Sequence, residues 1–238
     1  MASIQVSEQK GVRYLHFGSR CVQGAMRIGR PWALELEYTR LMMMPLAVHP
    51  SREWPASVLQ IGLGSASFTR FLHRHRPQAR ITVVEILPEV VAAARQFFKL
   101  PEDERVRIEI ADGHDWLIGT RRRFDLILVD AFDAKGRSGM IDSEPFYINC
   151  RDHLARGGIA SFNLMTRTRA AAPAIARMRA AFGERVWVLP QSEAGNVAVL
   201  AGVKPPSAET LAELRTAARL LKDATGLNLL PALPLTGV

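Results

Sequence analysis

The sequence has little cysteine and no long hydrophobic run. Its two cysteines, Cys21 and Cys150, lie far apart and lack the spacing of metal ligands. This is typical of free thiols in a reducing compartment. The first residues, MASIQVSEQKGVRY, contain no apolar stretch like that of a signal peptide. Because no apolar run is long enough to cross a bilayer, we expect a cytoplasmic protein without a membrane partner.

Several motifs that would assign a function are also absent. The sequence contains neither GxSxG nor GxxxxGK[ST], so hydrolase and P-loop interpretations have no support. The six histidines show no metal-ligand spacing. His73 and His75, for example, are two residues apart on an expected helix and point to different sides. We therefore expect no metal site.

Positive charge exceeds negative charge. The chain has 31 Lys and Arg against 23 Asp and Glu, a net charge of +8. Such an excess is found in proteins that bind nucleic acid, anionic membranes or small anions. Here the charge is spread along the chain, Arg121–Arg123 is the only tight cluster, and no nucleic-acid reading module is visible. We interpret the charge as a solvated surface and expect no nucleic-acid partner.

From residue 57 onwards, short apolar runs alternate with helical patterns. Strands are expected at 58–61, 81–84, 106–110, 125–129, 159–162, 186–189 and 197–200, and helices at 66–75, 88–99, 144–154, 170–182 and 208–221. This alternation is typical of βαβ units and a mostly parallel sheet. The last two strands are close enough in sequence to form an antiparallel hairpin at one edge. The pattern predicts an α/β, Rossmann-like fold.

Residues 1–50 follow a different pattern. Tyr14–Phe17 and Ala25–Ile28 are short strand-like runs, and a helix is expected over residues 34–44. We therefore predict two parts. A small N-terminal β-hairpin unit with a helix would occupy residues 1–50, and a Rossmann-like nucleotide-binding catalytic domain would occupy residues 51–238.

The first two strands of the sheet end in residues suited to a nucleotide. In open α/β sheets, ligands bind beyond the carboxyl ends of the strands. Gly62 and Gly64 let the backbone turn tightly and approach a ligand, and Ser65 belongs to the same turn; a purely structural turn would look alike. Glu85 follows Gly62 by about 20 residues, a spacing at which a carboxylate can accept hydrogen bonds from ribose hydroxyls. We assign these residues and Ile86 to the cofactor.

Acids also follow the third and fourth strands. Asp112, followed by Gly113, could accept a hydrogen bond from an adenine amino group, or it could cap the next helix. Asp130 and Asp133 flank an aromatic residue at the end of an apolar strand. An acid held there could act as a general base or pair with a cationic substrate, whereas the alternative is a loop with two solvated acids. We assign Asp112 and Gly113 to the cofactor, Asp133 to catalysis and Asp130 to both.

These positions, in this order, resemble the spermidine synthase family of aminopropyltransferases. The resemblance lies in VLQIGLGSAS, VVEILPEVVAAARQFFKLP, RVRIEIADGHDWL, FDLILVDAFDAKG and EPFYINCRDHLARGGIASFN, within residues 57–164. LELEYTRLM also resembles the family's Y-H-E-M-L segment. The resemblance implies a seven-stranded Rossmann-like sheet of the methyltransferase type behind a small N-terminal β-domain, commonly in a homodimer.

The resemblance also implies roles for individual residues. Glu85 would hold the ribose and Asp112 the adenine of decarboxylated S-adenosylmethionine. Asp130 would match the general base and Asp133 the second acid of the family's D-S-x-D motif. The acceptor in the family is a polyamine.

Departures from the family pattern concentrate at the amine end of the site. The family's glycine-rich loop carries an Asp that contacts the aminopropyl amine of the donor, and here Ser65 occupies that position. The His-Glu pair of the Y-H-E segment is Thr39–Arg40. The proline after the second acid is Ala134, and the glutamine after the fifth strand appears as Asn163.

We therefore expect a transferase that binds S-adenosylmethionine or its decarboxylated form, acts on a small-molecule acceptor such as an amine, and uses putrescine poorly. One alternative is a methyltransferase on the same fold, because the carboxylate of intact S-adenosylmethionine would no longer be repelled by the missing Asp. The other is a catalytically silent nucleotide-binding protein that acts through partners. The fold alone does not separate these functions.

Overall fold

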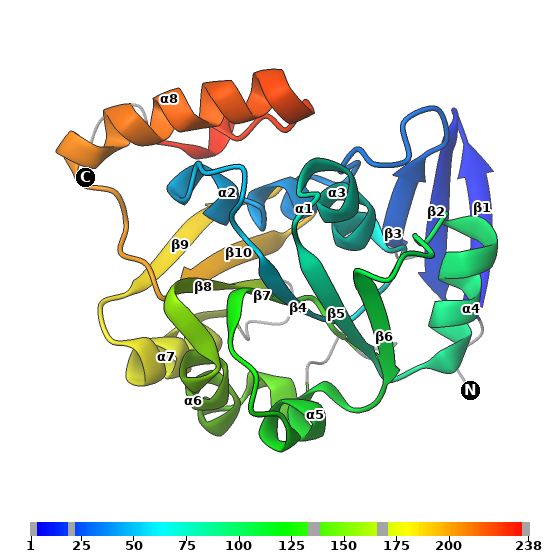
Figure 1. The fold of residues 1–238 in the computed structure, drawn as a ribbon, viewed down its shortest axis with the longest axis horizontal. Coiled ribbons are helices and arrows are strands. Elements are labelled where there is room, and N and C mark those ends of the chain that lie inside the picture. Colours follow the sequence, from blue (N-terminus) through cyan, green and yellow to red (C-terminus); the bar gives the residue numbers. More distant parts are fainter. Residues whose placement is uncertain (1–3, 19–21, 133–138, 166–170, 235–238) are drawn as a thin grey trace.

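Two β-sheets organise the protein (Figure 1). The computed structural model describes residues 4–18, 22–132, 139–165 and 171–234. The smaller sheet is antiparallel and consists of β1 (Ile4–Gln9), β2 (Val12–Phe17) and β3 (Val22–Arg27), in that order. The larger sheet has seven strands: β4 (Ser57–Ile61), β5 (Arg80–Glu85), β6 (Val106–Ile110), β7 (Phe124–Val129), β8 (Leu154–Met165), β9 (Val186–Gln191) and β10 (Asn196–Ala201).

The strand order of the large sheet is β6-β5-β4-β7-β8-β10-β9. Strands β4 to β8 are parallel to one another, whereas β10 is antiparallel to both β8 and β9. This confirms the predicted α/β fold with a seven-stranded, mostly parallel sheet and an antiparallel hairpin at one edge. The order reverses between β4 and β7, which is where ligands bind in sheets of this kind.

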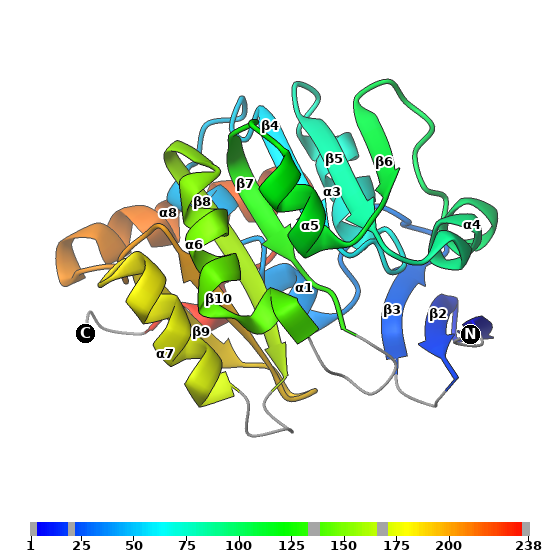
Figure 2. The same ribbon diagram turned by 90° about the horizontal axis from the view of Figure 1, so that it is seen from below.

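Helices cover both faces of the large sheet (Figures 1 and 2). They are α1 (Glu37–Leu41), α2 (Pro45–Val48), α3 (Ser67–His75), α4 (Pro88–Phe97), α5 (Gly113–Gly119), α6 (Glu144–Asp152), α7 (Ala171–Phe182) and α8 (Ala208–Thr225), with 3-10 turns η1 (Gly139–Asp142) and η3 (Leu230–Ala232). One apolar cluster joins α1 to α4 and α8 to the sheet, and the other joins α5, α6 and α7 to its opposite face. None of the described helices is both long and apolar enough to cross a membrane.

The central strand β7 shows why the core has two halves. Leu126 and Leu128 belong to one apolar cluster, and Ile127 and Val129 belong to the other. Successive side chains of a strand point to opposite faces, so a strand covered on both sides must be continuously apolar. The strand expected at 125–129, which is apolar after Asp125, is therefore the buried central strand that the structure shows.

The N-terminal region differs from the prediction in two ways. It forms three antiparallel strands, because β1, which is mostly polar, pairs with β2. The helix expected over residues 34–44 is shorter, since α1 covers only Glu37–Leu41, and Pro45 does not end a helix but lies in the first turn of the next one, α2. Proline suits the first turn of a helix, since its missing N–H would have no partner there. The domain boundary at residue 50 stays a prediction.

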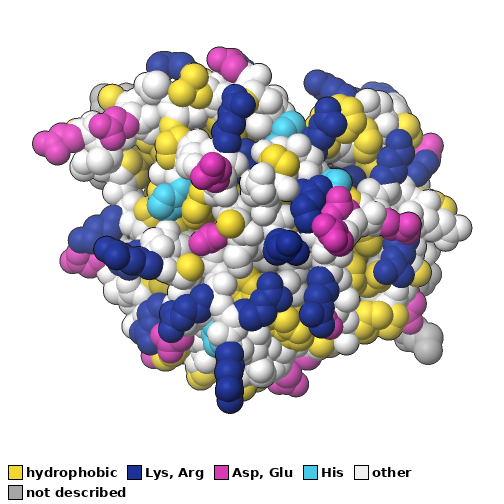
Figure 3. All heavy atoms as spheres, in the orientation of Figure 1, with side chains coloured by type: hydrophobic (Ala, Val, Ile, Leu, Met, Phe, Trp, Pro, Cys, Tyr) yellow, Lys and Arg dark blue, Asp and Glu magenta, His cyan; other side chains and the backbone are white. Residues whose placement is uncertain are grey.

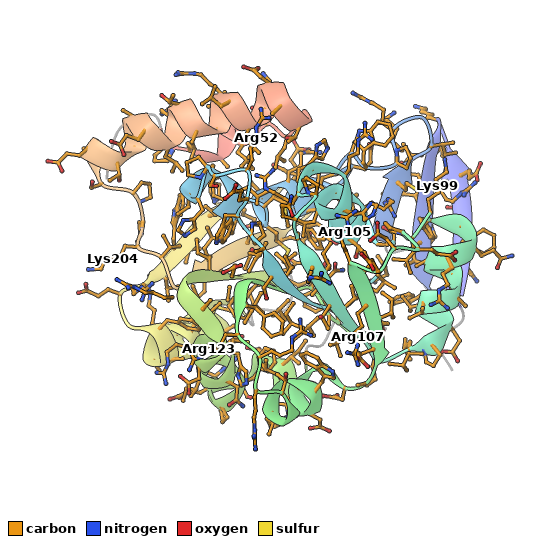
Figure 4. The ribbon with its side chains drawn as sticks, viewed as in Figure 1. Arg52, Lys99, Arg105, Arg107, Arg123 and Lys204 are labelled. Carbon is orange, nitrogen blue, oxygen red and sulfur yellow. The ribbon has the colours of Figure 1, made fainter. Side chains whose placement is uncertain are left out.

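Basic side chains are scattered over the face shown in Figure 3, with acidic ones among them. Figure 4 labels six of them: Arg52, Lys99, Arg105, Arg107, Arg123 and Lys204. Three of these six form ion pairs, Arg105 with Asp103, Arg107 with Glu109 and Lys204 with Glu184. Ion pairs at the protein surface contribute little to stability. The expectation of no nucleic-acid partner stays a prediction.

Candidate functional site

The carboxyl ends of neighbouring parallel strands bring the predicted site residues to one edge of the sheet. Gly62 follows β4, Glu85 ends β5, Asp112 follows β6, Asp130 follows β7, and Asn163 lies near the end of β8. Asp133 lies outside the described residues. Because β4 lies between β5 and β7, the glycine turn stands in the middle of this edge, between Glu85 and Asp130.

The turn after β4 requires a glycine at its first position. Gly62 has a φ of +89°, and a Cβ there would overlap the backbone carbonyl of Asp130. The ladder continues past the strand ends, since the Asp130 N–H donates to the Ile61 carbonyl over 2.9 Å. The glycine turn and the backbone of Asp130 are thus in direct contact. A ligand seated on the turn would lie next to this acid.

Glu85 is nearly buried, with 8% of its surface exposed. Its Oε2 accepts a hydrogen bond from Leu63 N, and its Oε1 accepts one from Leu87 N, both over 2.9 Å. Burial raises the pKa of this carboxyl, and the hydrogen bonds from backbone N–H groups oppose that rise. The backbone N–H groups of Gly64 and Ile86 also act on this carboxylate, and the ribose assignment of Glu85 stays a prediction.

Asp112 caps helix α5, as one of the two interpretations predicted. Its Oδ1 accepts hydrogen bonds from His114 N and Asp115 N over 2.8 and 3.2 Å. Side chains of Asp112, His114 and Asp115 each offer a ligand atom within 4.8 Å of the others, but the cap accounts for this grouping. A Cβ at Gly113 would overlap the side chain of Ile61, so this position also requires glycine.

Ile86 stands out because 57% of this large apolar residue is exposed at the same edge of the sheet. Its assignment and the adenine contact of Asp112 stay predictions.

The carboxylate of Asp130 accepts hydrogen bonds from two other side chains. Its Oδ1 accepts a hydrogen bond from Asn163 Nδ2 over 2.8 Å, and its Oδ2 accepts one from the Tyr38 hydroxyl over 3.1 Å. Burial raises the pKa of Asp130, while the hydrogen bonds from Asn163 and Tyr38 counteract the rise. Burial and the nearby carboxylate hold the pKa of Tyr38 well above 10, so its hydroxyl stays a donor. The arrangement holds a carboxylate in one orientation, ready to take a proton or to pair with a cation.

Tyr38 was not among the residues assigned from the sequence. It comes from α1 in the N-terminal region, yet it reaches the carboxyl end of β7. The signal that could have found it is the tyrosine of LELEYTRLM, which matches the tyrosine of the Y-H-E-M-L segment.

Ser65 packs against the small sheet. It is 2% exposed, its Oγ donates to the Ala25 carbonyl over 3.4 Å, and it shares a 3.0 Å hydrogen bond with Ser67 Oγ. A Cβ at Gly24 in β3 would lie 2.5 Å from Ser65 Oγ. The side chain is therefore tightly enclosed by β3, and its assignment to the cofactor stays a prediction.

Arg40 is engaged by its own segment of the chain. Its Nη1 donates to the carbonyl oxygens of Leu34 and Glu35 over 3.1 and 2.8 Å. Two backbone carbonyls thus accept hydrogen bonds from one nitrogen of the guanidinium.

Comparison with known proteins agrees with the resemblance seen in the sequence. Residues 35–166 match the family model described as spermine/spermidine synthase domain. A polyamine aminopropyltransferase from Neisseria meningitidis is 37% identical over 226 residues, which cover 94% of this chain and 85% of that protein.

Two solved structures share the fold. A probable spermidine synthase from Corynebacterium glutamicum has a TM-score of 0.75 at 20% identity and covers 94% of this chain and 91% of its own. Human methyltransferase-like protein 13 in complex with SAH has a TM-score of 0.70 at 23% identity, with coverages of 80% and 93%. Methyltransferases and spermidine synthases therefore share the architecture of this chain.

Proposed function

The chain belongs to the spermine/spermidine synthase family, and on this premise we propose that it transfers an aminopropyl group from decarboxylated S-adenosylmethionine to an amine acceptor. The observation that carries the proposal is the placement of Asp130. This carboxylate is oriented by Tyr38 and Asn163 and adjoins the glycine turn at Gly62. A nucleophile positioned there could lose its proton to a fixed acceptor while it attacks the donor.

The reaction divides the site into two ends. At the nucleotide end, Glu85 would accept hydrogen bonds from the ribose and Asp112 from the adenine. At the other end, the lone pair of the acceptor nitrogen attacks the carbon next to the sulfonium, and the carbon–sulfur bond breaks. Methylthioadenosine leaves with the electron pair, and Asp130 takes the proton from the acceptor nitrogen.

The acceptor is proposed to carry less positive charge than a diamine. The position of the family's Asp that contacts the donor amine is held by Ser65, which is buried against β3 and offers no carboxylate. The ammonium of the donor and those of a diamine would therefore share the remaining acids of the site. Arg40, which replaces the Glu of the family's Y-H-E segment, is not part of this argument, because its guanidinium already donates hydrogen bonds to the backbone carbonyls of Leu34 and Glu35. An ammonium group buried without a partner is costly.

Methyl transfer from S-adenosylmethionine is the second candidate function. Ser65 favours it, because without a carboxylate at this position the carboxylate of the intact donor meets no repulsion there. Human methyltransferase-like protein 13, which shares this fold, was solved in complex with SAH. A catalytically silent nucleotide-binding protein remains the third candidate.

Calorimetric titration with S-adenosylmethionine, its decarboxylated form and methylthioadenosine tests the proposal. Preference for the decarboxylated donor, followed by methylthioadenosine release with an amine acceptor, supports aminopropyl transfer. Preference for the carboxylated donor favours methyl transfer. Binding without turnover over a broad amine panel favours the silent protein.

A homodimer, which the resemblance implies, is also part of the proposal, and sedimentation equilibrium would test it.

A further inference from the structure

The polar contacts of Asp130 continue beyond its immediate partners. Asn163 accepts a hydrogen bond at its Oδ1 from Asn196 Nδ2 over 3.0 Å, while its own Nδ2 donates to Asp130. Asn196 begins β10, and Asn163 lies in β8. A chain of side-chain hydrogen bonds therefore runs from the β10 strand to the carboxylate.

The sheet register explains how the two asparagines meet. Asn163 pairs with Ala198, and Asn196 precedes Ala198 by two residues, so both asparagine side chains lie on one face as diagonal neighbours. Turn contacts hold Asn196 in place: its N–H donates to Ser192 Oγ over 3.0 Å, and Ser192 N donates back to the Asn196 carbonyl over 2.8 Å. The β9–β10 connection thus holds the backbone of Asn196 at the position from which its side-chain amide reaches Asn163.

Asn163 needs a partner at each end of its side-chain amide, because the oxygen and the NH₂ group are alike in size but one accepts and the other donates hydrogen bonds. The residue is 6% exposed, so its oxygen and its NH₂ group must both find partners inside the protein. A carboxylate accepts hydrogen bonds only, and Asn196 presents a donor. The pair therefore favours one orientation, in which the NH₂ group faces Asp130 and the oxygen faces Asn196.

We infer that Asn196 is a positioning residue of the proposed active site, which fixes the amide of Asn163 so that its NH₂ group donates to Asp130. Without the Asn196 donor, the oxygen of the nearly buried Asn163 amide loses this hydrogen bond, and the side chain is no longer held from both ends. Asn163 can then shift toward another donor, and its hydrogen bond to Asp130 weakens. Asn196 itself makes no contact with the reacting atoms.

Asn196→Leu is the variant that removes the donor while keeping a side chain branched at the same carbon. The inference rests on the proposed function only where activity is measured, because there Asp130 acts as a base and must be ionised to accept a proton. A hydrogen bond to a carboxylate stabilises its charged form, so its loss raises the pKa of Asp130. We expect the acidic limb of the kcat/KM profile to move to higher pH by about one unit, a tenfold change in proton affinity. The affinity for the donor nucleotide should stay within a few-fold.

Two further variants separate positioning from damage to the strand. Asn196→Ser keeps a polar side chain at this half-buried position but is too short to reach Asn163, so it should give the same shift. Gln191→Leu is the matched control in the neighbouring strand and should leave the profile unchanged. Within the part of the chain that the structure describes, Tyr38 is the only titratable group hydrogen-bonded to Asp130, so it is left intact in all variants.

An NMR titration of the Asp130 carboxyl carbon, assigned by its absence in Asp130→Asn, tests the inference without turnover. A higher pKa of Asp130 in Asn196→Leu than in the wild type supports the positioning role of Asn196, whether or not the protein turns over an amine. If no amine is a substrate, that result overturns only the proposed function. Normal turnover of the wild type, with an unchanged pKa and rate profile in both Asn196 variants, would overturn the inference and leave the proposed function intact.

Discussion

The hydroxyl of Tyr38 donates a hydrogen bond to Oδ2 of Asp130 over 3.1 Å, across 92 residues of sequence. This contact joins helix α1 of the N-terminal region to the carboxyl end of β7. It makes the N-terminal region a part of the proposed active site, because one of the two oxygens of the acid is oriented from there.

Removal of this hydroxyl in Tyr38→Phe should raise the pKa of Asp130. Burial already raises it, and the Tyr38 hydrogen bond is one of the two that oppose the rise. Asp130 must be ionised to act as a base, so activity should be lost first at low pH. We expect the acidic limb of kcat/KM to move up by about one pH unit. Tyr14→Phe in β2 is the matched control, and coincident profiles for the two variants would contradict the role of Tyr38.

Replacement of the acid itself, in Asp130→Asn, should abolish most turnover. The amide keeps the shape of the side chain but cannot take the proton. General bases contribute about 10²–10⁴-fold, and we expect a loss in that range. Titration calorimetry should show nucleotide affinity within a few-fold of the wild type. Asp152→Asn, at an exposed acid of α6, is the control. Retention of most activity in Asp130→Asn would place the base elsewhere, with Asp133 next.

Glu85→Ala should weaken binding of any adenosyl ligand at least tenfold. Hydrogen bonds to a charged acceptor contribute about 1.5–3 kcal/mol each, and the variant removes those to the ribose. It also removes the acceptors of Leu63 N and Leu87 N, so a thermal unfolding curve must accompany the titration. Glu89→Ala, at an exposed acid in the first turn of α4, controls for lost charge. An unchanged dissociation constant in folded Glu85→Ala would remove the ribose assignment.

Ser65→Asp, which restores the family's residue, should destabilise the protein instead of restoring an amine site. The side chain is 2% exposed and is enclosed by Gly24 and the carbonyl of Ala25. Overpacking costs about 1–3 kcal/mol, and the buried carboxylate would meet a carbonyl oxygen. We expect a clearly lower melting temperature, while Ser65→Ala should lose only about 1 kcal/mol. A Ser65→Asp protein as stable as the wild type would show that the pocket can open.

Putrescine should be a poor acceptor for the wild-type protein. The aminopropyl donor carries one ammonium and the diamine carries two, and Ser65 leaves one carboxylate fewer than in the family pattern. With the decarboxylated donor, we expect little spermidine by chromatography, and faster methylthioadenosine release with less cationic amines. Spermidine formation faster than with any other amine would refute this expectation.

The sequence alone determined the sheet and the order of its site residues. Apolar runs such as 126–129 are local signals, and each predicts a strand whatever the rest of the chain contains. Once the strands are parallel, their carboxyl ends must share one edge, so Gly62, Glu85, Asp112 and Asp130 come together by topology alone. The cap on α5 by Asp112 is equally local, since it joins residues only two and three apart.

The tertiary structure decided what surrounds Asp130 and Ser65. The Tyr38 and Asn196 contacts depend on how α1 and β10 pack beside β7 and β8, and no local pattern encodes such packing. The same holds for Ser65, whose position in the glycine turn suggested a ligand contact but whose hydroxyl faces β3. The pairing of β1 with β2 could not be predicted either, because the sequence of β1 is mostly polar. Local periodicity in the sequence determines where helices and strands form. Side chains far apart in the sequence become partners only when the helices and sheets pack together.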